Sequence, residues 1–390
     1  MTRFLEDILR QPDELERTLG YLGGAGWHRL EEAAGRLRRA SHVYLTGIGS
    51  SWHAALCAAP LFAAGARPVY LQDAAELLHF AAWPRDAVIV AISRTGKSLE
   101  IVRLLAKARE SGATVIAVTN AENGTLAREA QIPILVPVTF DHAISVNTYS
   151  TLVLAAGLLA WTALRSFDDA LISTLSGVIG AAAQSIAGWQ EQIARSSWLT
   201  PGASYYFLAR GSSLGSCHEA RLLWEEGAKS PATAMGTGGF RHGPQEMVAA
   251  GLRFGIWIDG RRLREEDLAV ARDLRKLGAG VMLIGQNLPE DAGDLVLQLP
   301  EMSAEWQFVI DAIPAQLAAE RLAQLAGADC DSFRLCSYIV EHDGGLFDEN
   351  VVAPDDHGNG FQGREARRGA KTTPRDQMSL AEAAVKKRNQ

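Results

Sequence analysis

The stretch HVYLTGIGSS, residues 42–51, gives the clearest indication of the fold. Its first residues are mostly β-branched, aromatic or aliphatic, which is typical of a strand, and a glycine-rich turn then leads into a helix from Trp52. Similar apolar runs follow, separated by helical patterns, at residues 68–71, 87–92, 114–118 and 132–136. This alternation predicts an α/β fold with a mainly parallel sheet and helices on both faces.

The second half of the chain repeats this arrangement. A strand at residues 205–209 is followed by the turn Arg210-Gly-Ser-Ser and a helix through Glu226. Further strands are expected at residues 254–258, 280–284 and 295–299, and helices at residues 4–40, 144–198, 264–277 and 302–326. Two α/β units of similar order suggest an internal duplication.

These patterns divide the chain into three parts. Residues 1–195 should hold N-terminal helices and the first α/β domain, and residues 196–345 the second. Residues 346–390 are rich in Asp, Gly, Arg and Lys, so we expect a mobile tail or arm, with a short helix near Leu380.

Composition narrows the function classes. The 390 residues are 47% hydrophobic and 21% charged with a net charge of -7, a soluble globular profile. Because no dense Lys/Arg tract is present, nucleic acid is not expected as a partner. The apolar run at residues 151–164 is shorter than a membrane span and predicts a buried helix, so no membrane association is expected. The N-terminus does not read as a signal peptide, and the spacing of the four cysteines fits neither zinc nor disulfides, which favours a cytoplasmic location.

Two loops that follow strands predict a phosphate site. Residues 47–51 (GIGSS) and 93–98 (SRTGKS) each follow a strand and open a helix, where backbone amides attract anions. The candidate phosphate-binding side chains are Ser50, Ser51, Ser93, Arg94, Thr95 and Ser98. Neither loop has the spacing of a P-loop or of a dinucleotide fingerprint. The alternative is that the serines merely cap helices.

A third stretch, WEEGAKSPATAMGTGGFRHGPQE at residues 224–246, contains candidate proton-transfer groups. A predicted helix carries Glu225 and Glu226, a small-residue loop at 233–239 follows, and then His242. A carboxylate and an imidazole in one region suit general acid–base catalysis. The alternative is a surface helix and an ordinary turn, with His242 as a helix cap.

The second half lacks a serine-rich loop after its strand at 254–258, where residues 259–264 read DGRRLR. We therefore expect one phosphate site per chain, held by the first half, with the reacting groups supplied by the second.

Taken together, these motifs resemble tandem sugar isomerase (SIS) proteins, such as the isomerase half of glucosamine-6-phosphate synthase and its amino-sugar deaminase and deglycase relatives. The resemblance runs from residue 42 to residue 341, and its anchors are the stretches 47–51, 92–98, 119–120, 208–211 and 240–244 (FRHGP). It implies two SIS domains, each with a mainly parallel, flavodoxin-like sheet.

The resemblance also implies residue roles. Ser51, Ser93, Thr95 and Ser98 match positions that bind the sugar phosphate, and Ser50 and Arg94 match neighbouring positions that line it. Glu226 matches the carboxylate that moves a proton between C1 and C2 of the open-chain sugar. His242 matches the histidine associated with ring opening or proton donation. Glu225 ranks lower, because its side chain points about 100° away around the helix.

Further expectations concern cofactors and assembly. The chemistry demands no metal and no organic cofactor, since a carboxylate and a proton donor suffice. The resemblance implies a homodimer in which His242 reaches the neighbouring subunit's site.

Two departures from the synthase bear on the reaction. The chain begins Met1-Thr2, without the nucleophilic cysteine of a glutaminase half, so glutamine-dependent amination is not expected. Cys336 and Ser337 stand where the synthases carry a ring-opening lysine, which leaves that step to His242.

Three hypotheses follow. The first is an amino-sugar 6-phosphate deaminase or ketose–aldose isomerase. The second is a deglycase of 6-phosphofructosyl-amines (Amadori compounds). The third is a non-catalytic sugar-phosphate sensor, which is disfavoured because Glu226 and His242 are both present.

Overall fold

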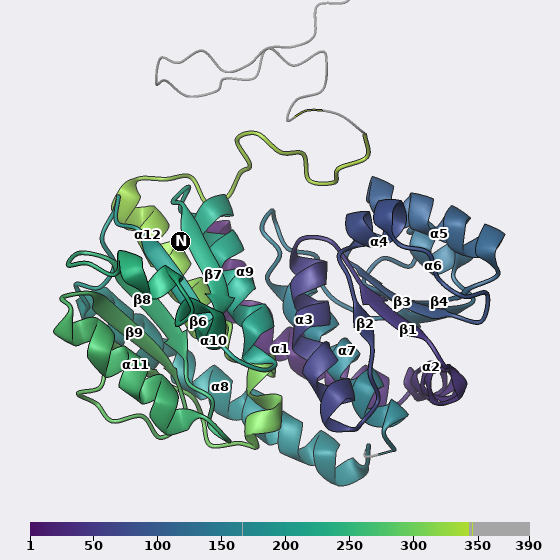
Figure 1. Ribbon diagram of the computed structural model, residues 1–390, viewed down its shortest axis with the longest axis horizontal. Helices are drawn as coiled ribbons and strands as arrows, with labels where there is room; N and C mark the ends of the chain where they lie inside the picture. Colours follow the sequence, from purple (N-terminus) through teal and green to yellow (C-terminus); the bar gives the residue numbers. More distant parts are fainter. Residues whose placement is uncertain (166, 343–344, 346–390) are drawn as a thin grey trace, which may run out of the picture. The chain divides into compact units, whose positions relative to one another are not determined.

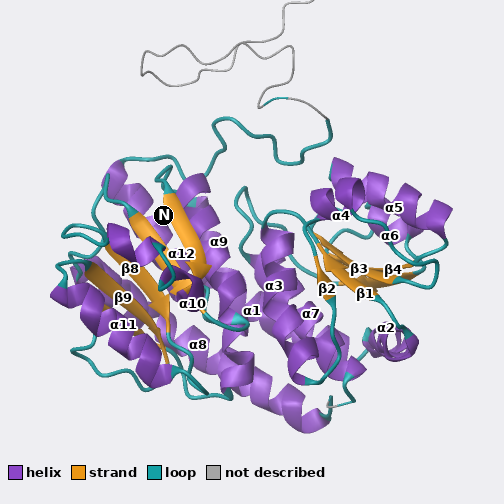
Figure 2. Cartoon of the chain, in the orientation of Figure 1, coloured by secondary structure: helices purple, strands orange, loops and turns teal. Residues whose placement is uncertain are grey.

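The computed structural model describes residues 1–165, 167–342 and 345, and residues 1–346 group into one compact unit. It contains two five-stranded parallel sheets with helices packed on them (Figures 1 and 2). The α/β prediction is confirmed. The predicted tail at 346–390, with its helix near Leu380, lies outside the described residues, and the boundary at residue 195 stays a prediction.

The first sheet has the strand order β2-β1-β3-β4-β5. Its strands are β1 (Val43–Thr46), β2 (Tyr70–Leu71), β3 (Val88–Ser93), β4 (Thr114–Thr119) and β5 (Ile132–Leu135). Its helices are α3 (Ser50–Ala64), α4 (Ala74–Phe80), α5 (Leu99–Ser111) and α6 (Thr125–Glu129). β1 and β3 are buried along their whole length, as expected of central strands in a sheet covered on both faces.

The second sheet has the order β10-β9-β8-β6-β7, so β6 and β8 take the places that β1 and β3 hold in the first. Its strands are β6 (Tyr205–Ala209), β7 (Ala232–Gly236), β8 (Arg253–Trp257), β9 (Gly280–Gly285) and β10 (Leu295–Gln298). Its helices are α9 (Ser213–Glu226), α10 (Thr237–Phe240), α11 (Arg264–Lys276), α12 (Ile313–Ala326) and the 3₁₀ turns η1 (Pro244–Met247) and η2 (Ala304–Val309). The shared topology is consistent with an internal duplication.

Two sequence predictions are wrong in detail. Residues 233–239, expected to form a loop, contribute to the edge strand β7 and to the short helix α10. These small residues have low strand propensity, and pairing with β6 supplies the hydrogen bonds that stabilise the strand. The single helix expected at 302–326 is divided into η2 and α12.

Four further helices complete the fold, namely α1 (Arg3–Gly23), α2 (Trp27–Arg39), α7 (Asn147–Ala163) and α8 (Asp169–Arg195). The stretch predicted to be helical at 4–40 forms α1 and α2, which are separated by the glycine-containing residues 24–26. α7 is almost entirely buried, which confirms the prediction for residues 151–164.

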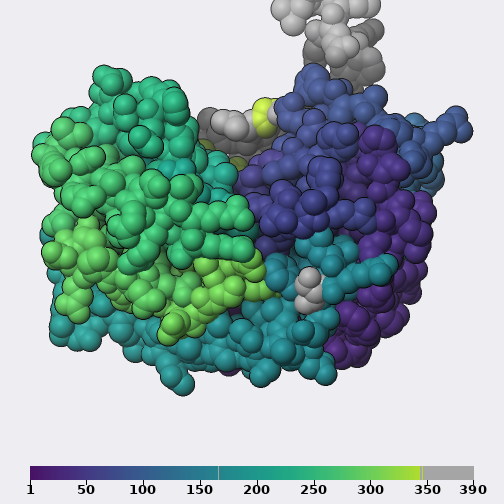
Figure 3. All heavy atoms as spheres, turned by 60° about the horizontal axis from the view of Figure 1, so that its bottom comes forward, coloured from purple at the N-terminus to yellow at the C-terminus, as the bar shows by residue number. Residues whose placement is uncertain are grey.

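α8, which lies in the teal region along the lower edge of Figure 3, packs its apolar side against α1, α12 and β10. Among the described helices, α8 alone has the length and apolar composition of a membrane span, criteria that core helices of soluble proteins also meet.

The largest hydrophobic core includes side chains from both halves, with α1, α3, α7, α9 and α12 all contributing. The close contact between α3 and α9 depends on Gly215, because a Cβ atom there would lie 2.3 Å from the Cys57 sulfur and 2.4 Å from the His53 carbonyl oxygen. This contact brings a helix of the second half beside the first loop of the first half.

Candidate active site

The loop after β1 is shaped by two glycines. Gly49 has a φ of 58°, a conformation that favours glycine, and it directly precedes the first residue of α3. A Cβ atom on Gly47 would lie 2.6 Å from the backbone of Ser51. The chain therefore turns tightly enough to place Ser50 and Ser51 at the start of α3, at the carboxyl end of the sheet.

The loop after β3 is held by its own side chains. Ser93 Oγ accepts from the Gly96 amide at 3.0 Å, and Thr95 Oγ1 accepts from the Lys97 amide at 3.3 Å. Ser98 sits at the N-cap of α5 without a capping hydrogen bond from its side chain. The Ser98 hydroxyl therefore does not cap α5, and it is available to bind a ligand.

One cavity of about 320 Å³ unites the predicted groups. All six predicted phosphate-site residues line it, and so does Glu226, which comes from α9 in the other half of the chain. The carboxyl ends of β1 and β3, neighbouring strands of one sheet, explain why the two loops meet. The packing of α9 on α3 explains why Glu226 faces them.

Glu226 lies at the last residue of α9 and is half-buried. Burial, together with the nearby Glu219 carboxyl, raises its pKa to about 7, although Arg94 and Lys229 oppose the shift. A carboxylate with a pKa near neutrality can both accept and return a proton. Glu225, in contrast, forms an ion pair with Arg221 at 2.5 Å.

A C-terminal segment that we call the strap, residues 333–340, covers this cavity. Arg94 donates to the Tyr338 carbonyl oxygen at 2.9 Å, and its guanidinium lies 4.1 Å from the centre of the Tyr338 ring. The Leu99 amide donates to the Val340 carbonyl oxygen at 3.1 Å. The strap also places Cys336 in the cavity with Glu226. Arg94 thus links the loop after β3 to the strap.

Sequence reasoning missed a buried pair beneath the cavity. Glu219 Oε2 lies 2.6 Å from His53 Nδ1, and Ser50 Oγ donates to Glu219 Oε1 at 3.0 Å. Burial raises the pKa of Glu219 to about 8 and lowers that of His53 to about 3. Both shifts favour a neutral pair near pH 7, in which the Glu219 carboxyl donates to His53. The Ser50 hydrogen is then committed to Glu219.

Glu219→Gln tests this assignment, because glutamine reproduces the protonated carboxyl. In the folded wild type, Glu219 keeps a proton that the unfolded chain releases above its ordinary pKa of 4.5. Stability from this group is therefore lost as pH rises from about 4.5 through about 8. We expect the melting temperature of the variant, relative to wild type, to rise between pH 6 and pH 9. A constant difference across that range would contradict a protonated Glu219.

His242 does not line the cavity. It lies in the exposed turn between α10 and η1, where its amide bonds to the Gly239 carbonyl oxygen. The structure therefore unites the phosphate-loop residues with Glu226 within one chain, and it leaves His242 apart from them.

The equivalent loop of the second half is filled by a side chain of the protein itself. The Asp259 carboxylate accepts from the amides of Arg261, Arg262 and Leu263 at 3.0–3.1 Å. These amides follow β8 as the serine-rich loop follows β3. An internal carboxylate occupies the position where an external anion would bind, which agrees with the expectation of one phosphate site per chain.

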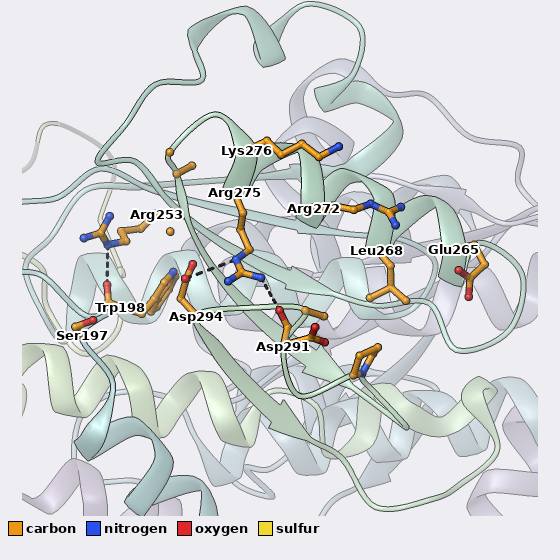
Figure 4. A pocket seen from close by; sticks show the side chains of 15 residues that line it. Ser197, Trp198, Arg253, Glu265, Leu268, Arg272, Arg275, Lys276, Asp291 and Asp294 are labelled. Carbon is orange, nitrogen blue, oxygen red and sulfur yellow. Dashed lines mark hydrogen bonds and ion pairs between the residues drawn. The ribbon is translucent and has the colours of Figure 1, made fainter.

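A larger hollow lies elsewhere, beside α11 and the start of β9 (Figure 4). Two of its arginine side chains already bind other groups of the protein. Arg275 contacts Asp294 and the Asp291 carbonyl oxygen, and Arg253 donates to the Trp198 carbonyl oxygen. It contains none of the predicted catalytic or phosphate-binding residues. The described residues also contain no group of three or more His, Cys, Asp or Glu side chains placed to hold a metal.

The structure is that of an α/β protein with two parallel sheets of matching strand order and serine-rich loops at the carboxyl end of the first sheet. Residues 36–161 match the SIS domain family, so this part of the chain is a SIS domain. The glutamine–fructose-6-phosphate aminotransferase [isomerizing] of Pyrobaculum aerophilum is 28% identical over 343 residues, which cover 85% of this chain and 56% of that protein. The enzyme of the same name from Symbiobacterium thermophilum is 28% identical over 348 residues, with 85% and 57% covered. The chain thus spans little more than half the length of these curated relatives.

Solved structures share the fold over most of the chain. The C-terminal domain of glucosamine-fructose-6-phosphate aminotransferase from Francisella tularensis has a TM-score of 0.75 at 19% identity, covering 85% of this chain and 98% of that one. Glucosamine-6-phosphate deaminase from Thermotoga maritima has a TM-score of 0.71 at 20% identity, with 87% and 99% covered. Tagatose-6-phosphate ketose/aldose isomerase from Escherichia coli has a TM-score of 0.74 at 21% identity, with 85% and 95% covered. At these identities the likeness concerns the fold alone.

Proposed function

We propose that the protein is an amino-sugar 6-phosphate deaminase or ketose–aldose isomerase that transfers a proton between C1 and C2. One observation carries the proposal, namely that a single cavity holds the serine-rich loops together with Glu226. The names of the T. maritima and E. coli structural relatives, a deaminase and an isomerase of sugar phosphates, agree with this reaction class.

In the deaminase reaction, the phosphate of an open-chain aldosamine binds at Ser51, Ser93, Thr95 and Ser98. Glu226 removes the proton from C2, an enaminol forms as the C1 oxygen is protonated, and Glu226 returns a proton to C1. The resulting C2 imine reacts with water, so that the C–N bond breaks and ammonia and a ketose 6-phosphate leave. General acid–base catalysis of this kind contributes about 10²–10⁴-fold.

We also propose that the active form is a homodimer in which His242 of one copy serves the site of the other. Within the described residues of one chain, His242 is exposed and does not line the cavity, so the predicted proton donor is missing from its own site. A second copy of this chain can supply it. A cytoplasmic location and the absence of nucleic-acid partners, membrane partners, cofactors and metals stay predictions.

The pH dependence of kcat/KM tests the role of Glu226. The carboxyl must be ionised in the free enzyme to accept a proton, and its pKa is about 7. We expect kcat/KM to rise with pH through this value and to fall about tenfold per pH unit well below it. A flat profile from pH 5 to pH 8, measured with a sugar phosphate that the protein turns over, would exclude Glu226 as the base.

The deglycase alternative uses the same proton transfer in the opposite direction. Glu226 takes a proton from C1 of a ketosamine 6-phosphate and returns it to C2, which generates a C1 imine. Water then releases the amine and a hexose 6-phosphate.

A further inference from the structure

We propose that a second cavity, at the carboxyl end of the second sheet, is a non-catalytic binding site for an organic anion with an aromatic or aliphatic body. This second cavity has a volume of about 490 Å³ and is lined in part by residues 210–213 and 259–263. It shares no lining residue with the first cavity, that of the serine-rich loops. Its ligand would therefore be distinct from the sugar phosphate, and the site lies beyond the function proposed above.

The second cavity has the same place in its sheet that the first cavity has in the other. Residues 210–213 follow β6 and residues 259–263 follow β8. The connections that leave these two neighbouring strands lead to opposite edges of the sheet, as they do for β1 and β3. Open α/β sheets bind ligands in the crevice at such a point. The matching topology thus provides a second hollow where this type of sheet holds a ligand.

The two cavities differ in the residue that ends the helix reaching each of them. α3 and α9 pack on each other (Figure 1). α9 runs from Ser213 in the second cavity to Glu226 in the first. α3 runs the other way, from Ser50 in the first cavity to Ala64 in the second. An alanine therefore stands where the first cavity has its proposed base, so the second cavity is suited to binding and not to proton transfer.

Arg262 is the cation that the second cavity offers to a ligand. Asp259 directs its carboxylate at three amides of its own loop, which leaves no backbone cradle there for a phosphate. Glu305 forms an ion pair with Arg261, and Arg210 pairs with a buried aspartate of α11 at 2.7 Å. The Arg262 side chain is exposed, and within the described residues its guanidinium has no hydrogen-bond or ion-pair partner. A guanidinium of this kind binds a carboxylate or a sulfonate through two parallel hydrogen bonds.

The wall that the first half of the chain contributes is apolar. It contains Leu61 from α3 and, from the end of α7, Trp161 and Leu164. The Trp161 ring lies against Trp306, with the ring centroids 5.0 Å apart. An aromatic or aliphatic body would remove this surface from water, while one anionic group on it would pair with Arg262.

The test uses 8-anilino-1-naphthalenesulfonate, an aromatic anion that fluoresces in apolar surroundings, and N-phenyl-1-naphthylamine, the same ring system without the sulfonate. For the wild type, we expect saturable binding of the anion, about tenfold tighter than that of the neutral compound. Arg262→Gln should remove this difference and leave the affinity for the neutral compound unchanged. Arg272→Gln is the matched control, because Arg272 is also exposed but lines the larger hollow beside α11.

A second pair of variants locates the probe. Ala64→Phe places a ring in the second cavity, whereas Ala63→Phe changes the adjacent exposed residue of α3, which does not line it. We expect Ala64→Phe to weaken the binding of both compounds by about tenfold or more, and Ala63→Phe to leave it unchanged.

Several outcomes would overturn the proposal. Equal effects of the two phenylalanine variants, or a loss of binding with Arg272→Gln, would place the probe elsewhere. Binding without saturation would mean an adventitious additive only. Equal wild-type affinities for the two compounds would remove the preference for an anion. Because no part of this test involves a sugar phosphate, its failure would leave the proposed function standing.

Discussion

Glu226→Gln should lower kcat by about 10²–10⁴-fold, because the amide cannot accept a proton from C1 or C2. Glutamine has nearly the same shape, and the Glu226 side chain bonds to no other described group, so the fold should be preserved. Binding of a sugar 6-phosphate, measured by isothermal titration, should stay within about threefold of wild type, since the loops that hold the phosphate are unchanged.

Glu225→Gln is the comparison for this result. Glu225 is adjacent in sequence, yet it pairs with Arg221 and does not line the cavity of the serine-rich loops. We expect most of the activity on an unsubstituted aminosugar phosphate to remain. Equal losses in the two variants would indicate a general effect of removing charge from the end of α9 and not the loss of a base.

His242→Ala should also reduce turnover by about 10²–10⁴-fold if the imidazole is the proton donor. The side chain is exposed, so the free energy of unfolding should change by less than about 0.5 kcal/mol. Co-expression of the His242→Ala and Glu226→Gln chains should restore activity, because a mixed dimer has one site with both an intact Glu226 and an intact partner histidine.

Two outcomes would count against this account of His242. Wild-type turnover by the single variant would remove the residue from the reaction. An inactive variant without rescue in the mixed dimer would mean that His242 acts within its own chain, after a movement of the turn that carries it. Tagged chains and purification of the mixed species make the two outcomes distinguishable.

Much of the fold could be predicted because local patterns and tertiary context agree. Strands such as β3 are continuously apolar, and the turns after β1 and β3 carry glycine and serine exactly where a parallel sheet ends. The two loops therefore had to meet at one edge. The pairing of β7 could not be predicted, because residues 232–236 (ATAMG) have low strand propensity and gain their hydrogen bonds from β6.

The sequence indicated the two serine-rich loops and Glu226 as parts of the candidate site, but it gave little indication of the residues that surround them. Glu219 lies two helical turns before Glu226 on the same face of α9, so its spacing was a usable signal. Its partner His53 depends on the close approach of α3 that Gly215 permits, which no local pattern indicates. The strap has no periodicity either, and its contacts with Arg94 and Leu99 hold it over the cavity.

The most direct test is an end-point assay of the purified protein and its Glu226→Gln variant. Glucosamine 6-phosphate, galactosamine 6-phosphate and 6-phosphofructosyl-amino acids would be supplied separately, and ammonia, free amino acid and sugar phosphate would be measured. We predict that the wild type converts at least one of these compounds and that the variant converts none at a comparable rate. Ammonia with a ketose phosphate would identify a deaminase, and a free amino acid with a hexose phosphate a deglycase. If the wild type converted none of them while a sugar phosphate still raised its melting temperature, the protein would be a sensor and the catalytic account would be contradicted.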